Sequence, residues 1–272
     1  MSAARGQTGA LLLRAVVAAW LVGLVGVPLG TLVVRALQAD GGVWAATLGS
    51  PVARAALWLS LWTSALCAVL NGVMGLLVAW ALARWQFPGR KVIAALVDLP
   101  LAVPTLVTGV VIVALYGPQT ALGGALASAG APVAFAPPGI LLALLFVTLP
   151  LVVRAVEPVL HELDPAEEEA ASMLGADRLT TLRRVLLPPL YPALAAGMVQ
   201  TFARATAEFG SLSVVSGNIP FQTLTAPVYV LGEIEGGNVP GATVASLVLL
   251  AFALTLHGAG VALARRSGVR HA

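Results

Sequence analysis

Long apolar runs separated by short polar segments form the main pattern of this sequence. Six runs are long enough to be considered as membrane spans, because a bilayer core of roughly 30 Å needs about 20 apolar residues. They cover residues 11–37, 55–83, 92–116, 138–153 (with a continuation towards Val159), 189–215 and 242–264. The pattern therefore predicts an all-α, polytopic membrane protein with six transmembrane helices.

The first run raises the alternative of a cleaved signal peptide. Signal peptides have an apolar core of ~7–15 residues that is followed by a small-residue cleavage site. The run at residues 11–37 is longer than such a core, and no clear cleavage site follows it. We therefore expect it to be kept as the first span, preceded by a short polar tail that carries Arg5.

Residues 157–189 form the one long polar segment between apolar runs, and they hold seven of the twelve acidic residues. Asp164 is placed to cap a helix, and Pro165 suits the first helical position because its missing N–H costs nothing there. The glutamates at positions 167, 168 and 169 place negative charge near the positive end of the helix dipole. Gly175 is expected to take the left-handed conformation that closes such a helix.

A second short helix is predicted after this turn. Asp177 is placed to cap it, and apolar residues recur at helical spacing until Pro188 and Pro189, where we expect the helix to end. A helix, a glycine turn and a second helix also describe a helix-turn-helix unit that reads DNA. The context of the segment has to decide between the two interpretations.

The composition decides against DNA binding. Hydrophobic residues make up 59% of the chain and charged residues 10%, with a mean hydropathy of +0.94. A soluble domain carries about 25% charged residues, so this chain belongs in a membrane and nucleic acid is not an expected partner. Cys67 is the only cysteine, which excludes a disulfide framework and a cysteine-rich metal site. We expect neither a metal nor a cofactor.

The basic residues predict the orientation. The loops at residues 117–137 and 216–241 contain no Lys or Arg, as expected for loops outside the cytoplasm. With the N-terminus inside, the inner segments collect twelve of the fifteen basic residues, namely Arg5, Arg14, Arg84, Arg90, Lys91, Arg154, Arg178, Arg183, Arg184, Arg265, Arg266 and Arg270. Both termini and the segment at residues 157–189 are therefore expected to be cytoplasmic.

That segment resembles a known motif. It contains Glu169-Ala170-Ala171, three residues, Gly175, nine residues and then Val185-Leu186-Leu187-Pro188. This spacing is similar to the EAA loop in the membrane subunits of binding-protein-dependent ABC importers. The resemblance implies a type I importer permease fold, with a cytoplasmic coupling helix between spans 4 and 5 that docks on an ATPase subunit. It implies this coupling role for Glu169, Ala170, Ala171, Gly175, Leu187 and Pro188.

Other stretches resemble the permeases of sulfate/thiosulfate importers in particular. They are DLPLAVPT (98–105), FAPPGI (135–140), LPLVVR (149–154), FARA (202–205) with EFG (208–210), and SGNIPF (216–221). Molybdate permeases share the Glu-Phe-Gly and Gly-Asn-Ile-Pro elements but are usually shorter, so a molybdate or tungstate importer is the alternative. Ala207 stands where this family often has glycine, so the approach of the backbone at that point differs.

The resemblance also implies an organisation and a set of partners. We expect an N-terminal tail, first span and outside loop at residues 1–54, a permease core at 55–264 and a cytoplasmic tail at 265–272. The implied partners are an ATPase in two copies, a related but distinct second permease, and an extracytoplasmic sulfate-binding protein. The resemblance implies a location in the bacterial cytoplasmic (inner) membrane, in contact with its lipid.

The sequence offers no site for catalysis by this chain itself. It has no Gly-rich loop followed by Lys-Ser or Lys-Thr, and Lys91 is its only lysine, so ATP hydrolysis is expected on a partner. No Ser/His/Asp arrangement gathers in the outside loops, which disfavours a membrane hydrolase. An ATP-independent secondary anion transporter is a further alternative, but such proteins often show inverted repeats, and no repeat is visible.

Two pairs of residues within the spans are candidates for the translocation pathway. Pro100 and Pro104 are expected to break the third span, and such breaks either line a pathway or act as kinks for packing. Arg204 and Glu208 lie four residues apart on one predicted helical face, well inside a span. Because buried charges need partners, we favour a structural ion pair here over direct contact with the anion. Asp98 is interpreted as capping or snorkelling near the inner end of the third span.

Overall fold

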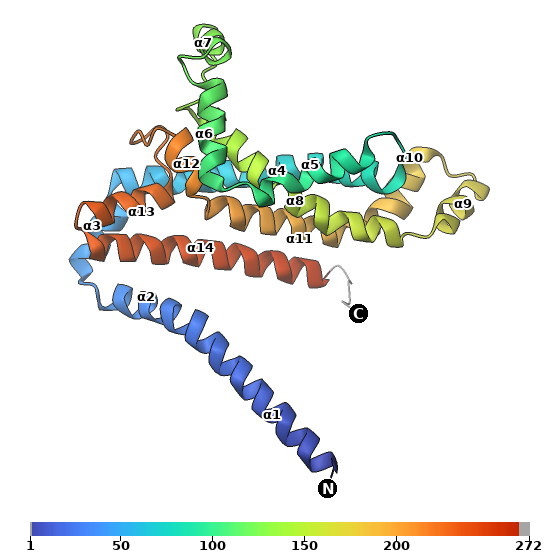
Figure 1. The fold of residues 1–272 in the computed structure, drawn as a ribbon, viewed down its shortest axis with the longest axis horizontal. Helices are drawn as coiled ribbons and strands as arrows, with labels where there is room; N and C mark the ends of the chain where they lie inside the picture. The colour runs from blue at the N-terminus through green and yellow to red at the C-terminus, as the bar shows by residue number, and fades with distance from the viewer. Residues whose placement is uncertain (1, 267–272) are drawn as a thin grey trace. The chain divides into compact units, whose positions relative to one another are not determined.

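The computed structural model describes residues 2–266, and every regular element in this range is helical (Figure 1). The elements are α1 (Ser2–Leu21), η1 (Val22–Gly26), α2 (Val27–Gln38), α3 (Gly41–Gly49), α4 (Pro51–Arg84), α5 (Arg90–Ala102), α6 (Thr105–Tyr116), α7 (Ala121–Ser128), α8 (Pro137–Glu162), α9 (Pro165–Met173), α10 (Arg178–Thr181), η2 (Leu182–Leu186), α11 (Leu187–Thr206), α12 (Gly210–Val215), α13 (Ala226–Glu235) and α14 (Val239–Arg266). The elements η1 and η2 are π-helical turns. The all-α prediction is confirmed.

Five helical segments in the described part of the chain are long and apolar enough to cross a membrane. They are Leu12–Gln38, Pro51–Arg84, Pro137–Glu162, Arg178–Thr206 and Val239–Leu256. A sixth span results if α5 and α6 are counted together, although they are bent by 110° at the break between them. The prediction of a helical, multi-span protein therefore agrees with the structure, and the third span differs most from a simple rod.

The bend in the third span lies at Pro104 alone. Val103 is extended, with φ −82° and ψ 126°, because a proline disfavours the helical conformation of the residue before it. Pro100, which we also expected to break the span, lies inside α5, and the helix continues past it to Ala102. That part of the prediction was wrong, because a single missing N–H close to the end of a helix removes only one backbone hydrogen bond.

The helix that we expected to end before Pro188 and Pro189 instead continues through both prolines into α11. The preceding turn, η2, is π-helical, and the N–H of Leu187 donates to the carbonyl of Leu182 five residues earlier. This wider turn changes the hydrogen-bond register just before the prolines, so their missing N–H groups do not stop the helix. The same device occurs in η1, where Val27 donates to Val22 directly before Pro28.

The fifth span is shorter at its C-terminal end than the predicted 189–215. Helix α11 ends at Thr206, and α12 begins as a separate helix at Gly210. The backbone is not helical at positions 208 and 209. The side chain of Glu208 accepts a hydrogen bond from the N–H of Ser211 in the first turn of α12, which stabilises a new helix start at this point.

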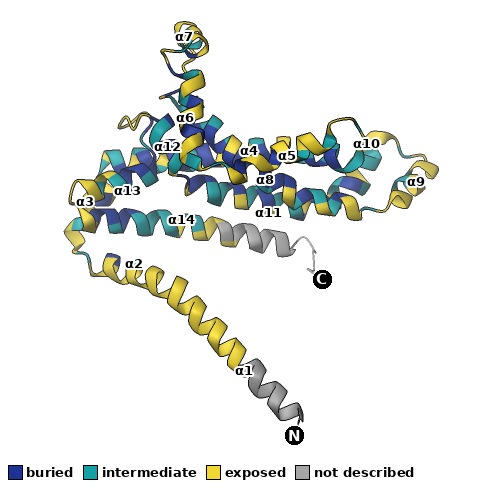
Figure 2. Ribbon diagram, in the orientation of Figure 1, coloured by how far each residue is buried: buried dark blue, intermediate teal, exposed yellow. Residues whose placement is uncertain are grey.

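The chain divides into two compact units, of which the first comprises Met1–Ser50 and Val230–Val248. Within it, the indole of Trp44 on α3 donates to the carbonyl of Ala36 on α2, with an N···O distance of 2.9 Å. Asp40 caps α3 by accepting from the N–H of Gly42. Helix α2 is otherwise exposed along its length, as Figure 2 shows. Within this unit, its apolar surface is left uncovered, as expected for a helix that crosses a membrane.

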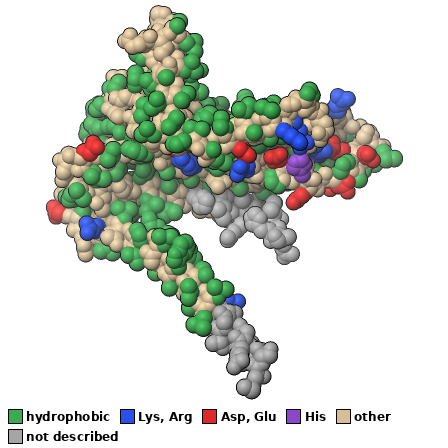
Figure 3. Space-filling model, in the orientation of Figure 1, with side chains coloured by type: hydrophobic (Ala, Val, Ile, Leu, Met, Phe, Trp, Pro, Cys, Tyr) green, Lys and Arg blue, Asp and Glu red, His purple; other side chains and the backbone are tan. Residues whose placement is uncertain are grey.

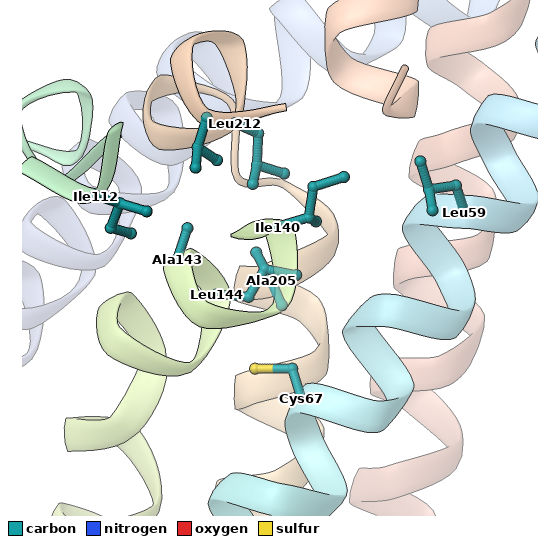
Figure 4. Close-up of a cluster of buried hydrophobic side chains, with 9 residues drawn as sticks. Leu59, Cys67, Ile112, Ile140, Ala143, Leu144, Ala205 and Leu212 are labelled. Atoms are coloured by element: carbon teal, nitrogen blue, oxygen red, sulfur yellow. The ribbon is translucent and has the colours of Figure 1, made fainter. Parts of the chain in front are cut away.

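The second unit comprises Pro51–Tyr229 and Leu249–Ala272, and α4, α8 and α11 form its core. One buried cluster, drawn in Figure 4, joins these helices to α6 and α12. Its residues are Leu59, Cys67, Ile112, Ile140, Ala143, Leu144, Ala205, Leu212 and Val215. A second cluster fills the other end of the bundle and includes Ala79, Leu82, Val97, Val152, Val153, Val156, Leu160 and Leu190. The core is therefore continuous along these three helices.

A buried polar contact fixes α4 against α8 between the two clusters. The amide of Asn71, which is 2% exposed, donates to Thr148 Oγ1 at 2.9 Å and to the carbonyl of Leu145 at 3.1 Å. Cys67 Sγ lies 3.3 Å from the same hydroxyl. A polar group in an apolar interior has few alternative partners, so these bonds specify the register of the two helices.

Glycine lets the same helices approach closely. A Cβ added at Gly75 on α4 would lie 2.7 Å from Val152 Cβ on α8, and one added at Gly197 on α11 would lie 3.0 Å from Val152 Cα. Small residues at such crossings let helices in membranes pack with large contact area. Val152, which is fully buried, is therefore enclosed from both sides.

We expect Gly75→Val to destabilise the bundle by about 1–3 kcal/mol, because the added methyl groups overpack the α4–α8 crossing. The matched control is Gly30→Val on α2, where an added Cβ has no neighbour within 4 Å. Thermal unfolding of the purified variants in detergent measures the difference. A Gly75→Val protein that melts with the wild type would contradict the close crossing.

Candidate functional site

The segment that resembles the EAA loop begins later than the sequence suggested. Helix α8 continues to Glu162, so Glu157 and Glu162 belong to a long helix and not to the loop. Helix α9 then starts as predicted: Asp164 caps it by accepting from the N–H of Ala166 at 2.9 Å, and Pro165 occupies its first turn. Local sequence rules therefore place the start of this helix correctly.

The turn after α9 also follows the prediction. Gly175 has φ +82°, and its N–H donates to the carbonyl of Ser172, while the N–H of Ala176 donates to that of Ala171. This pair of bonds is the Schellman arrangement, which requires a left-handed residue and so favours glycine. Asp177 then caps α10 by accepting from the N–H of Thr180. Hydrogen bonds from the Thr180 side chain and backbone lower the pKa of Asp177.

Helix α9 presents an exposed surface. None of its nine residues is buried, and the apolar side chains of Met173 and Leu174 at its end are 88% and 89% exposed. Figure 3 shows that charged side chains gather at this end of the second unit. A protein-binding surface offers this mixture of exposed apolar and charged side chains.

The predicted coupling residues fall into two groups. Glu169, Ala170 and Ala171 lie on α9 and Gly175 in the turn after it, while Leu187 and Pro188 lie at the start of α11, beyond η2. Glu169 and Ala170 are exposed and Ala171 is half-buried. The first group therefore lies in one short segment of the chain, whereas the second belongs to the N-terminal end of a span.

A second candidate site lies where two broken spans meet. An added Cβ at Gly109 on α6 would lie 2.6 Å from the carbonyl oxygen of Ser211 on α12, and one at Gly210 would collide with Thr105 Oγ1. The break at Val103–Pro104 thus lies beside the break that ends α11. Paired helix breaks are a common construction for substrate pathways, because they place free backbone groups within the membrane.

Arg204 and Glu208 form an ion pair at this junction, with 2.6 Å between Arg204 Nη1 and Glu208 Oε2. Glu208 lies just beyond the end of α11, in the break itself, and not on the helical face that we predicted. Its other oxygen accepts from the N–H and the hydroxyl of Ser211. The side chain of Glu208 is 1% exposed and that of Arg204 is 40% exposed. Both carboxylate oxygens are thus occupied, while the guanidinium keeps a solvent-accessible side.

A further ion pair was not anticipated from the sequence. Arg154 Nε on α8 donates to Asp98 Oδ1 on α5 at 2.9 Å. Asp98 therefore has a partner and does not simply cap a helix or extend towards water, as we had interpreted it. Both side chains are about half exposed in this chain, so the pair faces water or another protein and not lipid.

Non-glycine residues with positive φ values cluster in two loops, at residues 129–136 and 216–225. Phe135, Asn218 and Phe221 have positive φ values of 60°, 55° and 65°. The loops touch, since the N–H of Phe135 donates to the carbonyl of Val215, and an added Cβ at Gly217 would lie 3.0 Å from the Phe135 ring. Strained residues of this kind persist only where surrounding contacts hold them, and they are enriched at functional sites.

Comparison with known protein families identifies the group to which these features belong. Residues 71–268 match the family described as the binding-protein-dependent transport system inner membrane component. The chain belongs to this family. It is therefore a multi-pass component of the inner membrane, and it is the membrane part of an ABC transport system whose ATPase and binding protein are separate partners.

Three relatives are similar over most of the chain. The probable sulfate transport system permease protein cysT of Nephroselmis olivacea is 44% identical, and the match covers 84% of this chain and 81% of that protein. The sulfate transport system permease protein CysT of Synechococcus elongatus is 43% identical (79% and 77% covered). That of Escherichia coli is 38% identical (84% and 83% covered).

Solved structures confirm the fold. A bacterial ABC transporter involved in the import of alginate matches with a TM-score of 0.78 and 18% identity, covering 97% of this chain and 96% of that one. The MetNI methionine ABC transporter, in an inward-facing conformation, matches with a TM-score of 0.59 and 20% identity, covering 79% and 95%. At these identities the similarity concerns the fold alone.

We expect Gly175→Val to weaken binding of the ATPase, because a β-branched residue at positive φ costs on the order of 1–2 kcal/mol and disfavours the turn that presents α9. Gly175→Asn is the matched control, since asparagine tolerates this conformation. Affinity co-purification of the ATPase with each variant gives the measurement. Wild-type recovery of the ATPase with Gly175→Val would show that the turn does not set the docking surface.

Proposed function

We propose that this chain is a permease subunit of an ATP-driven importer that moves sulfate or thiosulfate across the inner membrane. The observation that carries the proposal is the sequence identity of 38–44% to sulfate transport system permeases over about four-fifths of the chain. The stretches that resembled sulfate permeases include both sides of the paired breaks. An anion pathway at that junction is compatible with an arginine that keeps an exposed side.

The proposed complex contains a second, related permease, two copies of an ATPase and an extracytoplasmic sulfate-binding protein. One six-span chain supplies half of a pathway, and membership of the importer permease family supports a neighbouring permease chain. The distribution of basic residues supports cytoplasmic termini and a cytoplasmic position for α9. The strained outer loops at Phe135 and Phe221 are then available to the binding protein.

The proposed mechanism couples ATP hydrolysis to alternating access. Closure of the two ATPase subunits displaces α9, whose exposed surface is the docking site, and the spans rock from an inward-open to an outward-open arrangement. The binding protein then releases its anion into the opened pathway. In this proposal, Pro104 provides a bend in the pathway. The buried side chain of Pro100 keeps the preceding helix, α5, packed against the bundle.

The ion pair between Arg204 and Glu208 is proposed to be structural in this mechanism. Glu208 is buried and accepts from Arg204 and from Ser211, so it both neutralises the arginine and starts α12. An uncompensated carboxylate at this position would repel an anion and would be costly to bury. The pair therefore holds the junction of the two breaks in shape.

Reconstitution tests the function. The complete complex in proteoliposomes, with ATP inside and loaded binding protein outside, should take up labelled sulfate, and unlabelled thiosulfate should compete. Preferential uptake of molybdate or tungstate would reassign the anion. Uptake by this chain without an ATPase would overturn the proposal in favour of a secondary transporter. Growth of a deletion strain on each anion provides an independent check.

A double-mutant cycle tests the ion pair. Arg204→Ala alone should lower both thermal stability and sulfate uptake, because it leaves Glu208 buried without its cation. The change Glu208→Gln in the same protein should recover much of that loss if the pair is structural, because glutamine removes the buried charge and its amide oxygen can still accept from Ser211. Unfolding temperature and uptake are measured for each variant of the complex. A stable double variant with no recovery of uptake would instead make Arg204 a contact for the anion.

A further inference from the structure

Arg84 and Glu168 form an ion pair between the inner end of α4 and helix α9. The distance between Arg84 Nη1 and Glu168 Oε1 is 2.5 Å, and the two side chains are 20% and 34% exposed. Neither residue belongs to the sequence motif that identifies the coupling segment. The pair joins two elements that are far apart in the chain.

Arg84 is held firmly on the α4 side. It is the last residue of α4, and its guanidinium lies 5.6 Å from the ring centroid of Trp80, one turn earlier, where a cation–π interaction restrains it. Ala79 and Leu82 on the same part of α4 are buried against α8 and α11. Arg84 therefore projects from a rigid part of the bundle.

Helix α9, in contrast, is held loosely. It has no buried residue, and its terminal hydrogen bonds stay within the segment from Asp164 to Ala176. Through the chain it is joined to α8 at Leu163 and to α10 after the glycine turn. Among the residues that the structure describes, Glu168 makes the one ion pair that ties α9 to another helix.

We propose that the Arg84–Glu168 pair transmits displacement of α9 to α4, so that Arg84 is a positioning residue for coupling. This inference rests on the proposed function, in which an ATPase moves α9. The turns at both ends of α9 would otherwise absorb part of the movement by bending. With the pair intact, α9 acts on α8, on α11 through η2, and also on α4, so the three core helices move as one body.

The surroundings of the pair indicate that it cannot be lost without consequence. Arg84 Nε and Nη2 are shielded from solvent and have no hydrogen-bond partner among the described residues. Glu168 Oε1 is shielded as well, and it faces Arg84 Nη1 in the ion pair. The ion pair is thus the main compensation for their burial. Removing either charge leaves the other partly buried and free to turn away, which detaches α9 from α4.

The test uses the complete complex in proteoliposomes and measures the number of anions imported for each ATP hydrolysed. Arg84→Gln and Glu168→Gln should each lower this ratio about tenfold, and the exchange Arg84→Glu with Glu168→Arg should recover most of it. Glu167→Gln is the matched control, because Glu167 lies on the same turn of α9 and is exposed. The control should stay close to wild type.

Two results would overturn the inference: an unchanged ratio in both single variants, or an exchanged pair that assembles but transports no better than they do. If the single variants no longer bind the ATPase, binding that is restored in the exchanged pair supports the link. An exchanged pair that still fails to bind the ATPase refutes the link. A wild-type complex that imports no sulfate would reject the proposed function separately. In that case, coupling is compared between the wild type and the variants by the stimulation of ATP hydrolysis on addition of loaded binding protein.

Discussion

Polar groups inside a bilayer have to find their partners within the protein, because lipid offers none, and much of this structure follows from that constraint. Where α11 ends, Glu208 accepts from Ser211 on the next helix and from Arg204 on the previous one. Prolines remove N–H groups at the N-terminal end of the same span. Just before them, the π-helical turn η2 shifts the backbone hydrogen bonds from a four-residue to a five-residue spacing. These two interruptions are thus each accompanied by a specific local compensation.

The chain has a tightly packed part, the bundle of α4, α8 and α11, and a loosely attached part, helix α9. The crossings of α4, α8 and α11 are closed by glycines and by the Asn71–Thr148 hydrogen bond, so these helices have little freedom to slide. Helix α9 has no buried residue and is bounded by two tight turns. A partner that binds α9 can therefore move it without unfolding anything, and the bundle responds as a body to whatever links it to α9.

The sequence was most informative where structure depends on neighbouring residues. Asp164, Gly175 and Asp177 lie in the caps and turns that were predicted for them, because capping depends on a few adjacent positions. It was least informative where distant segments interact. The continuation of α11 through Pro188 and the ion pair between Arg84 and Glu168 depend on a π-helical turn and on helix packing, and no local pattern reports either. The coupling motif could be found by its spacing, whereas its attachment to α4 could not.

The asymmetry of the pair at the broken spans suits the transport of a dianion. An arginine without a partner in an apolar surrounding would hold a divalent anion strongly, and release would then limit transport, since conduction requires binding that is weak enough to reverse. Glu208 removes most of that attraction while staying buried itself, and Arg204 keeps an accessible side. On the proposed function, Glu208 sets how strongly Arg204 attracts a passing anion, and this attraction is too weak to bind the anion there. The helix break and the weak attraction would then have one cause, because the carboxylate that starts α12 is also the one that neutralises Arg204.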